Sequence, residues 1–456
     1  MFGLIVALLI VLVCGYLIIK SYKAQTVLIC GGFLMMAIAI AFNFGPILSA
    51  KESTGFVWFD LFQFVNTLTS KRTAELGMMI MVCAGFAKYM DKIGASKAMV
   101  NVATRPLTMI RSPYLVICGG FIIGQVLHPF IPSASGFGLL LMVTMYPLYV
   151  SLGISRTTAT AVIATNGCLD LGPTSGNSIL AAKYAGITPV EYFIQFQLPQ
   201  AIAISLVMTV AHFFVARYFA RKDAELELNI VAKQAEIKDK NDDVPPFFYA
   251  ILPTVPLVFV LLFGYFKIGG IKMDINVALF LGTFIAMLSE YVRSRDIKKV
   301  FGSIQTFFDG MGVQFATVVT LIVAGETFAK GLQSLGAINT LIGYAQAAGF
   351  GKDGMILVMS VIIMFCSLIM GSGNAPFFAF AAFAPDVAKK VGVEAVNLLL
   401  PMQLTASVTR AMSPITAVVV AVSGVAGVSP FEVVKRTAVP LASGLIVVQI
   451  MTYLMF

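Results

Sequence analysis

Long apolar runs alternate with short polar segments from one end of the chain to the other. In the first half the runs cover residues 2–19, 26–44, 74–90, 114–131, 137–150, 157–185 and 198–215. In the second half they cover residues 247–266, 275–291, 311–329, 355–370, 377–383, 396–425 and 439–456. Runs of roughly 18 or more apolar residues are typical of membrane-spanning helices. The pattern therefore predicts an all-α polytopic membrane protein.

The first run, residues 2–19, has no charge and is followed by Lys20 and Lys23. A secretory signal has its basic residues before the apolar stretch and a small-residue cleavage site after it. Because neither feature is present, we expect this run to be a retained membrane helix.

The two series of runs are related by an internal repeat. Phe-Ala-Lys at 86–88 recurs at 328–330, an offset of 242. The heptapeptide at 185–191 recurs with similar residues at 426–432, an offset of 241, and prolines recur at the same offset. Residues 221–243, between the series, are charged and too polar to cross. We predict a first transmembrane repeat over 1–216, a cytoplasmic linker over 217–246 and a second transmembrane repeat over 247–456.

Composition agrees with a lipid environment. Of the 456 residues 59% are hydrophobic and only 12% charged, which is about half the charged fraction of soluble domains. The net charge of +9 comes from basic residues that punctuate apolar runs, so it does not indicate nucleic-acid binding. The six cysteines lie in apolar stretches without metal-ligand spacing, so we expect no metal site.

Basic residues also predict the orientation in the membrane. If each half has five crossing helices and one re-entrant hairpin, the halves are inverted relative to each other. Twenty of the 31 Lys and Arg residues then lie on the side of the linker, ten lie on the opposite side, and Arg410 lies within the membrane. Basic residues are enriched on the cytoplasmic side, so both termini are predicted to be periplasmic. The aromatic segments at 56–64 and 300–308 are expected to lie in the membrane plane.

Four polar interruptions are the candidate binding region, two in each half. Residues 129–136 and 371–376 each predict a re-entrant hairpin, and residues 166–177 and 409–414 each predict a discontinuous helix. Broken helices are tolerated at membrane depth where they face protein or a water-filled cavity, and their N-termini favour anions. Paired breaks in two inverted halves are typical of a transporter's central site. The candidate substrate-binding residues are Ser133, Ser135, Gly136, Asn166, Thr174, Ser175, Ser372, Gly373, Asn374, Thr409, Arg410 and Ser413.

Arg410 is the most informative of these residues, because an arginine at mid-membrane costs about 2.5–3.5 kcal/mol. Its guanidinium can bind a carboxylate through two parallel hydrogen bonds. The alternative is a structural ion pair with Asp170 in the other broken helix. Asp170 and His128 are candidate proton-coupling groups, although each could instead have a structural role.

Enzyme functions find little support. The chain has two histidines, no zinc-binding His-Glu-x-x-His motif and no phosphate-binding glycine-rich loop. The short linker cannot hold a nucleotide-binding domain. We therefore expect a secondary transporter without a cofactor, driven by substrate or ion gradients.

Several motifs resemble the anaerobic C4-dicarboxylate carriers of the DcuC/DcuD type. They are Arg-Ser-Pro-Tyr at 111–114, Ser-Ala-Ser-Gly at 133–136, Met-Gly-Ser-Gly-Asn-Ala-Pro at 370–376 and the segments 413–420, 426–431 and 434–437. This resemblance implies membership of the ion transporter superfamily, with a scaffold, a moving transport domain and commonly a homodimer. It also implies exchange or efflux of succinate, fumarate or malate at the bacterial inner membrane.

One departure bears on the coupling ion. Sodium-coupled dicarboxylate carriers of the superfamily have Ser-Asn-Thr at both hairpin tips, whereas this chain has Ser-Ala-Ser at 133–135 and Ser-Gly-Asn at 372–374. Sodium coupling therefore does not transfer from the resemblance, and protons are the expected coupling ion. The predicted function is a C4-dicarboxylate carrier with elevator-type alternating access. The alternatives are a carrier for another small organic anion or an amino acid, and an anion channel.

Overall fold

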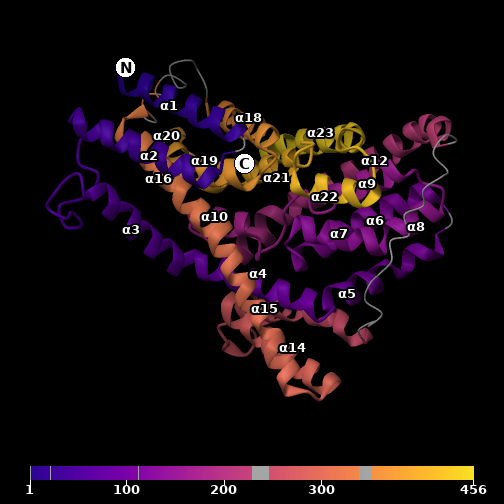
Figure 1. The fold of residues 1–456 in the computed structure, drawn as a ribbon. Coiled ribbons are helices and arrows are strands. Elements are labelled where there is room, and N and C mark those ends of the chain that lie inside the picture. The colour runs from indigo at the N-terminus through magenta and orange to yellow at the C-terminus, as the bar shows by residue number, and fades with distance from the viewer. Residues whose placement is uncertain are drawn as a thin grey trace.

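The computed structural model describes residues 2–20, 22–110, 112–227, 246–337, 340, 343 and 351–456. Arg111 and most of the predicted linker, residues 228–245, lie outside this part. The described residues form helices and connecting loops, with no strand among them (Figure 1). Eight helical segments within them are long and apolar enough to cross a membrane. These observations confirm the predicted all-α architecture.

The first group of helices, which we call the arm group, contains two long continuous helical arms. One arm runs from residue 60 to 92 and the other from 297 to 334, each through a π-helical turn, at Thr73–Gly77 and at Phe315–Val319. The group consists of α1 (Phe2–Ile19), α2 (Ala24–Ala41), α3 (Asp60–Arg72), α4 (Met78–Lys92), α5 (Ala95–Thr104), α13 (Val255–Phe259), α14 (Ile275–Ser294), α15 (Ile297–Gln314) and α16 (Thr320–Ser334). Helix α16 packs along α2, and α15 packs along α4. The segments expected to lie in the membrane plane thus continue without a break into α4 and α16.

The second group, which we call the hairpin group, contains both hairpins and both broken helices. It consists of α6 (Pro113–Leu127), α7 (Ala134–Thr144), α8 (Tyr146–Ser151), α9 (Arg156–Thr165), α10 (Gly176–Ala185), α11 (Pro189–Glu191), α12 (Leu198–Glu227), α18 (Lys352–Met370), α19 (Asn374–Ala381), α20 (Ala384–Val391), α21 (Ala395–Arg410), α22 (Ala417–Ala426) and α23 (Pro430–Met455). Helix α21 is buried along most of its length and packs against α18, α23 and α10. In Figure 1, α6, α7, α9, α22 and α23 lie together, while α4, α5, α14 and α15 form the lower part of the molecule.

All four predicted interruptions are present. The first hairpin turns between α6 and α7 and the second between α18 and α19. The first broken helix stops at Thr165 and resumes at Gly176, and the second stops at Arg410 and resumes at Ala417. The first break has positive φ at Gly167 (82°) and Gly172 (109°), which glycine adopts without steric cost. Asp170 also has a positive φ of 50°, which is uncommon for a residue other than glycine.

Helix boundaries follow the sequence repeat. Residues 78 and 92 of α4 plus 242 give 320 and 334, the ends of α16. Residues 176 and 185 of α10 plus 241 give 417 and 426, the ends of α22. Both α10 and α22 end at a left-handed glycine, Gly186 and Gly427, which terminates a helix at no steric cost. The opposite orientation of the halves and the limits of the two repeats remain predictions.

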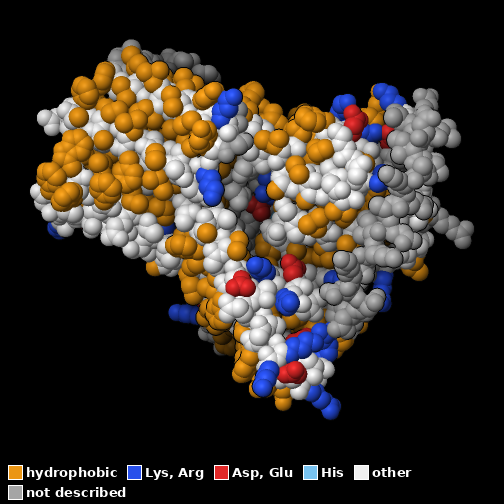
Figure 2. Space-filling view, in the orientation of Figure 1, with side chains coloured by type: hydrophobic (Ala, Val, Ile, Leu, Met, Phe, Trp, Pro, Cys, Tyr) orange, Lys and Arg blue, Asp and Glu red, His pale blue; other side chains and the backbone are white. Residues whose placement is uncertain are grey.

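The outer surface is apolar over much of its area. Large hydrophobic side chains are exposed along α1, α12, α14 and α23. Figure 2 shows them as broad orange areas, with charged side chains gathered at the lower end and at the edge of a central hollow. An apolar surface of this extent is expected where lipid is the solvent.

Candidate functional site

A cavity of about 620 Å³ lies between the two groups, where all four elements with interruptions come close to α4. The hairpin group contributes both hairpin tips and both breaks, and the arm group contributes α4, α15 and the second π-helical turn. Its polar and charged lining residues are Lys88, Asp91, Ser133, Ser135, Asp170, Thr174, Ser175, Asn177, Gln314, Thr317, Ser372, Asn374 and Arg410. Residues more than 300 positions apart, such as Lys88 and Arg410, thus share one polar cavity in an otherwise apolar protein.

The first hairpin tip is held against the first broken helix. Ser133 caps α7, its Oγ accepting a hydrogen bond from the backbone N–H of Gly136 at 3.2 Å. Thr174 Oγ1 donates to the carbonyl oxygen of Pro129 at 3.2 Å. A Cβ at Gly172 would lie 2.9 Å from the Pro129 Cβ, so the close approach depends on glycine.

The second hairpin tip packs against the second broken helix in a similar way. A Cβ at Gly373 would lie 2.9 Å from the carbonyl oxygen of Ala406 and 3.2 Å from Cδ of Arg410. The backbone N–H of Ala375 donates to Ser372 Oγ at 3.4 Å. The tip and Arg410 therefore form one packed unit at the cavity wall.

Asn177 connects the two halves at the cavity. Its Nδ2 donates to Asp170 Oδ2 at 2.6 Å and to Asn374 Oδ1 at 3.1 Å. Two buried glutamines, Gln197 and Gln403, donate to the carbonyl oxygen of Asp170, each at 3.4 Å. The polar groups of the first break are therefore held by hydrogen bonds from three different helices.

Arg410 ends α21 at the edge of the cavity and is half-buried. Its Nη2 donates to the carbonyl oxygen of Gly167 at 3.3 Å, and its own carbonyl oxygen accepts from Thr416 Oγ1. Among the described residues Arg410 and Asp170 form no ion pair, although both line the cavity. The structural ion pair considered from the sequence is therefore not formed in this conformation.

The predicted site residues either line the cavity or lie beside or behind its wall. Eight binding candidates and coupling candidates line the cavity, namely Ser133, Ser135, Asp170, Thr174, Ser175, Ser372, Asn374 and Arg410. Gly136 lines an adjoining cavity, and Gly373 packs under the second tip. The remaining candidates are buried behind the cavity wall, namely His128, Asn166, Thr409 and Ser413. No hydrogen-bond partner is present within the described part of the chain for either ring nitrogen of His128 or for the side-chain amide of Asn166. The roles of all these residues in binding or coupling remain predictions.

Sequence reasoning missed the residues that the arm group contributes to the lining of the central cavity. Lys88 and Asp91 project from α4, and Gln314 and Thr317 come from the second arm. The repeated Phe-Ala-Lys tripeptide was a usable signal, because a lysine at the same place in both repeats is unusual in a membrane helix.

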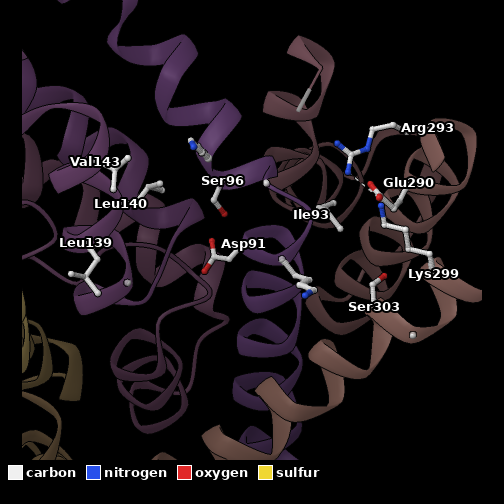
Figure 3. A pocket seen from close by; sticks show the side chains of 15 residues that line it. Asp91, Ile93, Ser96, Leu139, Leu140, Val143, Glu290, Arg293, Lys299 and Ser303 are labelled. Atoms are coloured by element: carbon white, nitrogen blue, oxygen red, sulfur yellow. Dashed lines mark hydrogen bonds and ion pairs between the residues drawn. The ribbon is translucent and has the colours of Figure 1, made fainter. Parts of the chain in front are cut away.

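A second cavity, of about 760 Å³, adjoins the first at Asp91, which lines both. Figure 3 shows Asp91 and Ser96 on one side of it and Glu290, Arg293 and Lys299 on the other. Arg293 Nη2 lies 3.0 Å from Glu290 Oε1. With Lys92 and Lys97 also in the lining, this cavity is predominantly basic. Its excess of basic side chains gives a positive potential beside the central cavity.

A third cavity, of about 400 Å³, lies near the opposite ends of α10 and α16 and shares no lining residue with the central one. Arg72 and Glu326 form an ion pair at its wall, with 2.7 Å between Arg72 Nε and Glu326 Oε1. Lys183 of the hairpin group lies 3.1 Å from Glu75 of the arm group. The two groups are thus joined by charges on this side.

Comparison with known proteins decides the family. The family model for the C4-dicarboxylate anaerobic carrier, DcuC, matches residues 2–456. The chain belongs to the DcuC family. It is 38% identical over 438 residues to the anaerobic C4-dicarboxylate transporter DcuC of Escherichia coli strain K12, covering 96% of this chain and 93% of the relative. It is 35% identical to the probable anaerobic C4-dicarboxylate transporter DcuC of Vibrio cholerae, covering 99% and 97%. The DcuC family and these relatives are transporters and not enzymes, and the chain is a multi-pass membrane protein.

Two solved transporter structures share the fold of this DcuC family member. The YdaH transporter of Alcanivorax borkumensis aligns with a TM-score of 0.56 at 13% identity, covering 95% of this chain and 99% of that one. MtrF of Neisseria gonorrhoeae aligns with a TM-score of 0.57 at 16% identity, covering 94% and 95%.

Proposed function

We propose that this protein is a secondary carrier for four-carbon dicarboxylates such as succinate, fumarate and malate. The observation that supports this most is the convergence of both hairpin tips, both breaks and Arg410 on one cavity. A small dicarboxylate has two anionic ends and few other groups. It therefore needs a polar cavity with several hydrogen-bond donors, which the hairpin tips, the breaks and Arg410 provide.

The donors available in the cavity suit carboxylate oxygens. Hydroxyl groups of Ser135 and Ser372 and the amide of Asn374 can donate hydrogen bonds. Helices α10 and α19 begin at the cavity, so their unpaired N–H groups and dipoles favour an anion there. Arg410 adds a fixed positive charge with planar, two-pronged donor geometry.

Alternating access is proposed to follow from movement of the hairpin group against a stationary arm group, as in an elevator. Both tips and both breaks belong to the hairpin group, so the binding site formed by these elements would move as a unit. Protons are the proposed coupling ion, with Asp170 or His128 as the carrier, and sodium coupling has no support at the hairpin tips. We propose exchange or proton-coupled transport by a homodimer in the bacterial inner membrane, with both termini periplasmic.

Two other functions make different experimental predictions. A carrier for another small organic anion or an amino acid would use the same binding site with a different substrate preference. An anion channel would conduct without counterflow. The proposed mechanism instead requires trans-stimulated exchange.

Uptake of radiolabelled succinate into proteoliposomes tests the proposal. Internal fumarate should accelerate uptake several-fold over empty proteoliposomes, and external malate should compete. Uptake that is insensitive to internal dicarboxylate, together with electrical conductance, would establish a channel. If the protein takes up no succinate but exchanges another anion, that anion is the substrate and the proposed substrate is wrong.

A further inference from the structure

One face of α4 lines the central cavity over almost three helical turns. The residues on this face are Ile80, Cys83, Ala84, Ala87, Lys88 and Asp91, which recur at the three- and four-residue spacing of one helix face. Most of these side chains are small or apolar. Lys88 is the one basic residue that the arm group contributes to the described lining of this cavity.

The equivalent face of α16 has a different environment. Adding 242 to the α4 positions gives Ile322, Gly325, Glu326, Ala329, Lys330 and Gln333. Here α16 packs closely on α19 of the second hairpin, and a Cβ at Gly325 would lie 2.8 Å from the carbonyl oxygen of Phe378. Beyond that contact, Lys330 lines the third cavity, with its Nζ 5.8 Å from the centre of the Phe64 ring. The two repeats thus place equivalent lysines in two separate cavities, Lys88 in the central one and Lys330 in the third.

The balance of charges in the central cavity indicates a role for Lys88 in binding an anion. The charged side chains that line it are Lys88, Arg410, Asp91 and Asp170, two cations and two acids. Lys88 is exposed to the cavity, and the described residues include no ion-pair partner for it. Without Lys88, a bound dianion would face two carboxylates with Arg410 as the only cation, which is unfavourable in a medium of low dielectric constant.

We propose that Lys88 and Lys330 are alternating contacts for a dianionic substrate. Lys88 binds the carboxylate not held by Arg410 while the central cavity adjoins the basic cavity. Lys330 makes the equivalent contact when the hairpin group has moved to the other side of the arm group. This inference rests on the proposed function and adds two specificity-determining residues to it.

Because both lysines lie on the arm group, each should affect substrate affinity from only one side of the membrane. Residues of the hairpin group, such as Arg410, accompany the substrate and would affect its affinity from both sides. A lysine on the stationary group meets the substrate in one orientation only. Loss of Lys88 should therefore weaken binding from one side of the membrane and loss of Lys330 from the other.

Succinate exchange in right-side-out and inside-out membrane vesicles tests this directly. In Lys88→Gln, KM for succinate should rise about tenfold or more in inside-out vesicles and change less than twofold in right-side-out vesicles, as expected for a charge-assisted hydrogen bond. In Lys330→Gln the pattern should be reversed. Lys88→Arg should recover most of the affinity because it restores the charge. Matched controls are Lys298→Gln and Lys51→Gln, exposed lysines that line none of the three cavities.

A second measurement separates substrate contact from a change in conformational equilibrium. Succinamate has one carboxylate replaced by an amide, so it lacks the group assigned to Lys88. The preference for succinate over succinamate should fall in Lys88→Gln by about the same factor as the affinity for succinate. Equal loss for both compounds would overturn direct contact.

The possible failures are distinguishable. If the parent protein exchanges no dicarboxylate, the proposed function is wrong whatever the variants do. If the parent exchanges succinate and both lysine variants retain its KM on both sides, the function stands and the lysine assignment is wrong. An effect of both variants on the same side would also overturn the alternating assignment. If Lys88→Gln instead raises KM in right-side-out vesicles and Lys330→Gln raises it in inside-out vesicles, the lysine assignment stands. The predicted membrane orientation is then reversed.

Discussion

Arg72 and Glu326 are 254 residues apart in sequence and are joined by two hydrogen bonds, from Nε to Oε1 at 2.7 Å and from Nη2 to Oε2 at 2.9 Å. Both side chains are largely buried, with exposed fractions of 13% and 10%. Arg72 also lies 2.9 Å from Glu75, which contacts Lys183 of the hairpin group. This network ties the two arms together and connects them to the hairpin group.

Removing the charge of Glu326 should destabilise the protein. In Glu326→Gln, Arg72 loses its bidentate partner in a largely buried place, and such a loss costs about 3–5 kcal/mol, less here because Glu75 remains. We expect a lower temperature of thermal unfolding in detergent. Glu394→Gln is a control, because this glutamate is exposed. An unchanged unfolding temperature would show that the pair contributes no net stability.

The contact between α16 and α19 makes Gly325 sensitive to any side chain. A Cβ in Gly325→Ala would lie 2.8 Å from a backbone carbonyl oxygen, so α19 must move away from α16. Such overpacking typically costs about 1–3 kcal/mol. We expect a lower unfolding temperature and slower succinate exchange. Gly312→Ala should leave both unchanged, because a Cβ there would meet no atom of another segment within 4 Å. Parental stability in the Gly325 variant would disprove the close contact.

The geometry of the Arg410 guanidinium should matter as well as its charge. Arg410→Lys keeps the charge but loses the planar two-pronged donor, so succinate affinity should fall, by roughly tenfold for each ~1.4 kcal/mol lost. Arg410→Ala should reduce affinity further, because the carboxylate assigned to Arg410 then meets only hydroxyl and amide donors and helix dipoles. Calorimetric or thermal-shift titration measures the change. Parental affinity in Arg410→Lys would rule out direct contact.

Asp170 can be tested separately from substrate binding. An asparagine in Asp170→Asn can still accept the hydrogen bond from Asn177, which is 2.6 Å long in the parent. We therefore expect dicarboxylate exchange to persist while stimulation by a pH gradient disappears. Uptake into proteoliposomes with and without an imposed gradient gives both quantities, with Asp353→Asn, an exposed aspartate, as control. A response to the gradient equal to the parent's would exclude Asp170 as the proton carrier.

Membrane orientation can be tested with single cysteines in a background without native cysteines. Lys298→Cys replaces an exposed residue on the predicted cytoplasmic side, and Lys51→Cys replaces one on the predicted periplasmic side. An impermeant thiol reagent should label Lys51→Cys in intact cells and Lys298→Cys only after permeabilisation. The opposite labelling would reverse the orientation and move both termini to the cytoplasm.

The sequence by itself determined the elements of this protein. Apolar runs define the helices because each must be long enough for a bilayer and satisfy its own backbone hydrogen bonds. The four interruptions were predictable because glycine, proline and short polar side chains act locally on the backbone. The repeat was visible because both copies keep the same helix-ending residues, such as Gly186 and Gly427.

Only the tertiary structure decided which polar side chains meet. Asp170 and Arg410, paired in one sequence-based interpretation, line the same cavity without an ion pair, and Asp170 is instead bonded to Asn177, which also reaches Asn374 of the other half. Glu326 is bound to Arg72, 254 positions away in the sequence. Lys88 and Lys330 have the same local sequence and different surroundings, because α19 covers α16 while α4 faces the cavity. The Phe-Ala-Lys tripeptide is the same in the two repeats, whereas the packing of the surrounding helices is not, and the tripeptide by itself does not specify that difference.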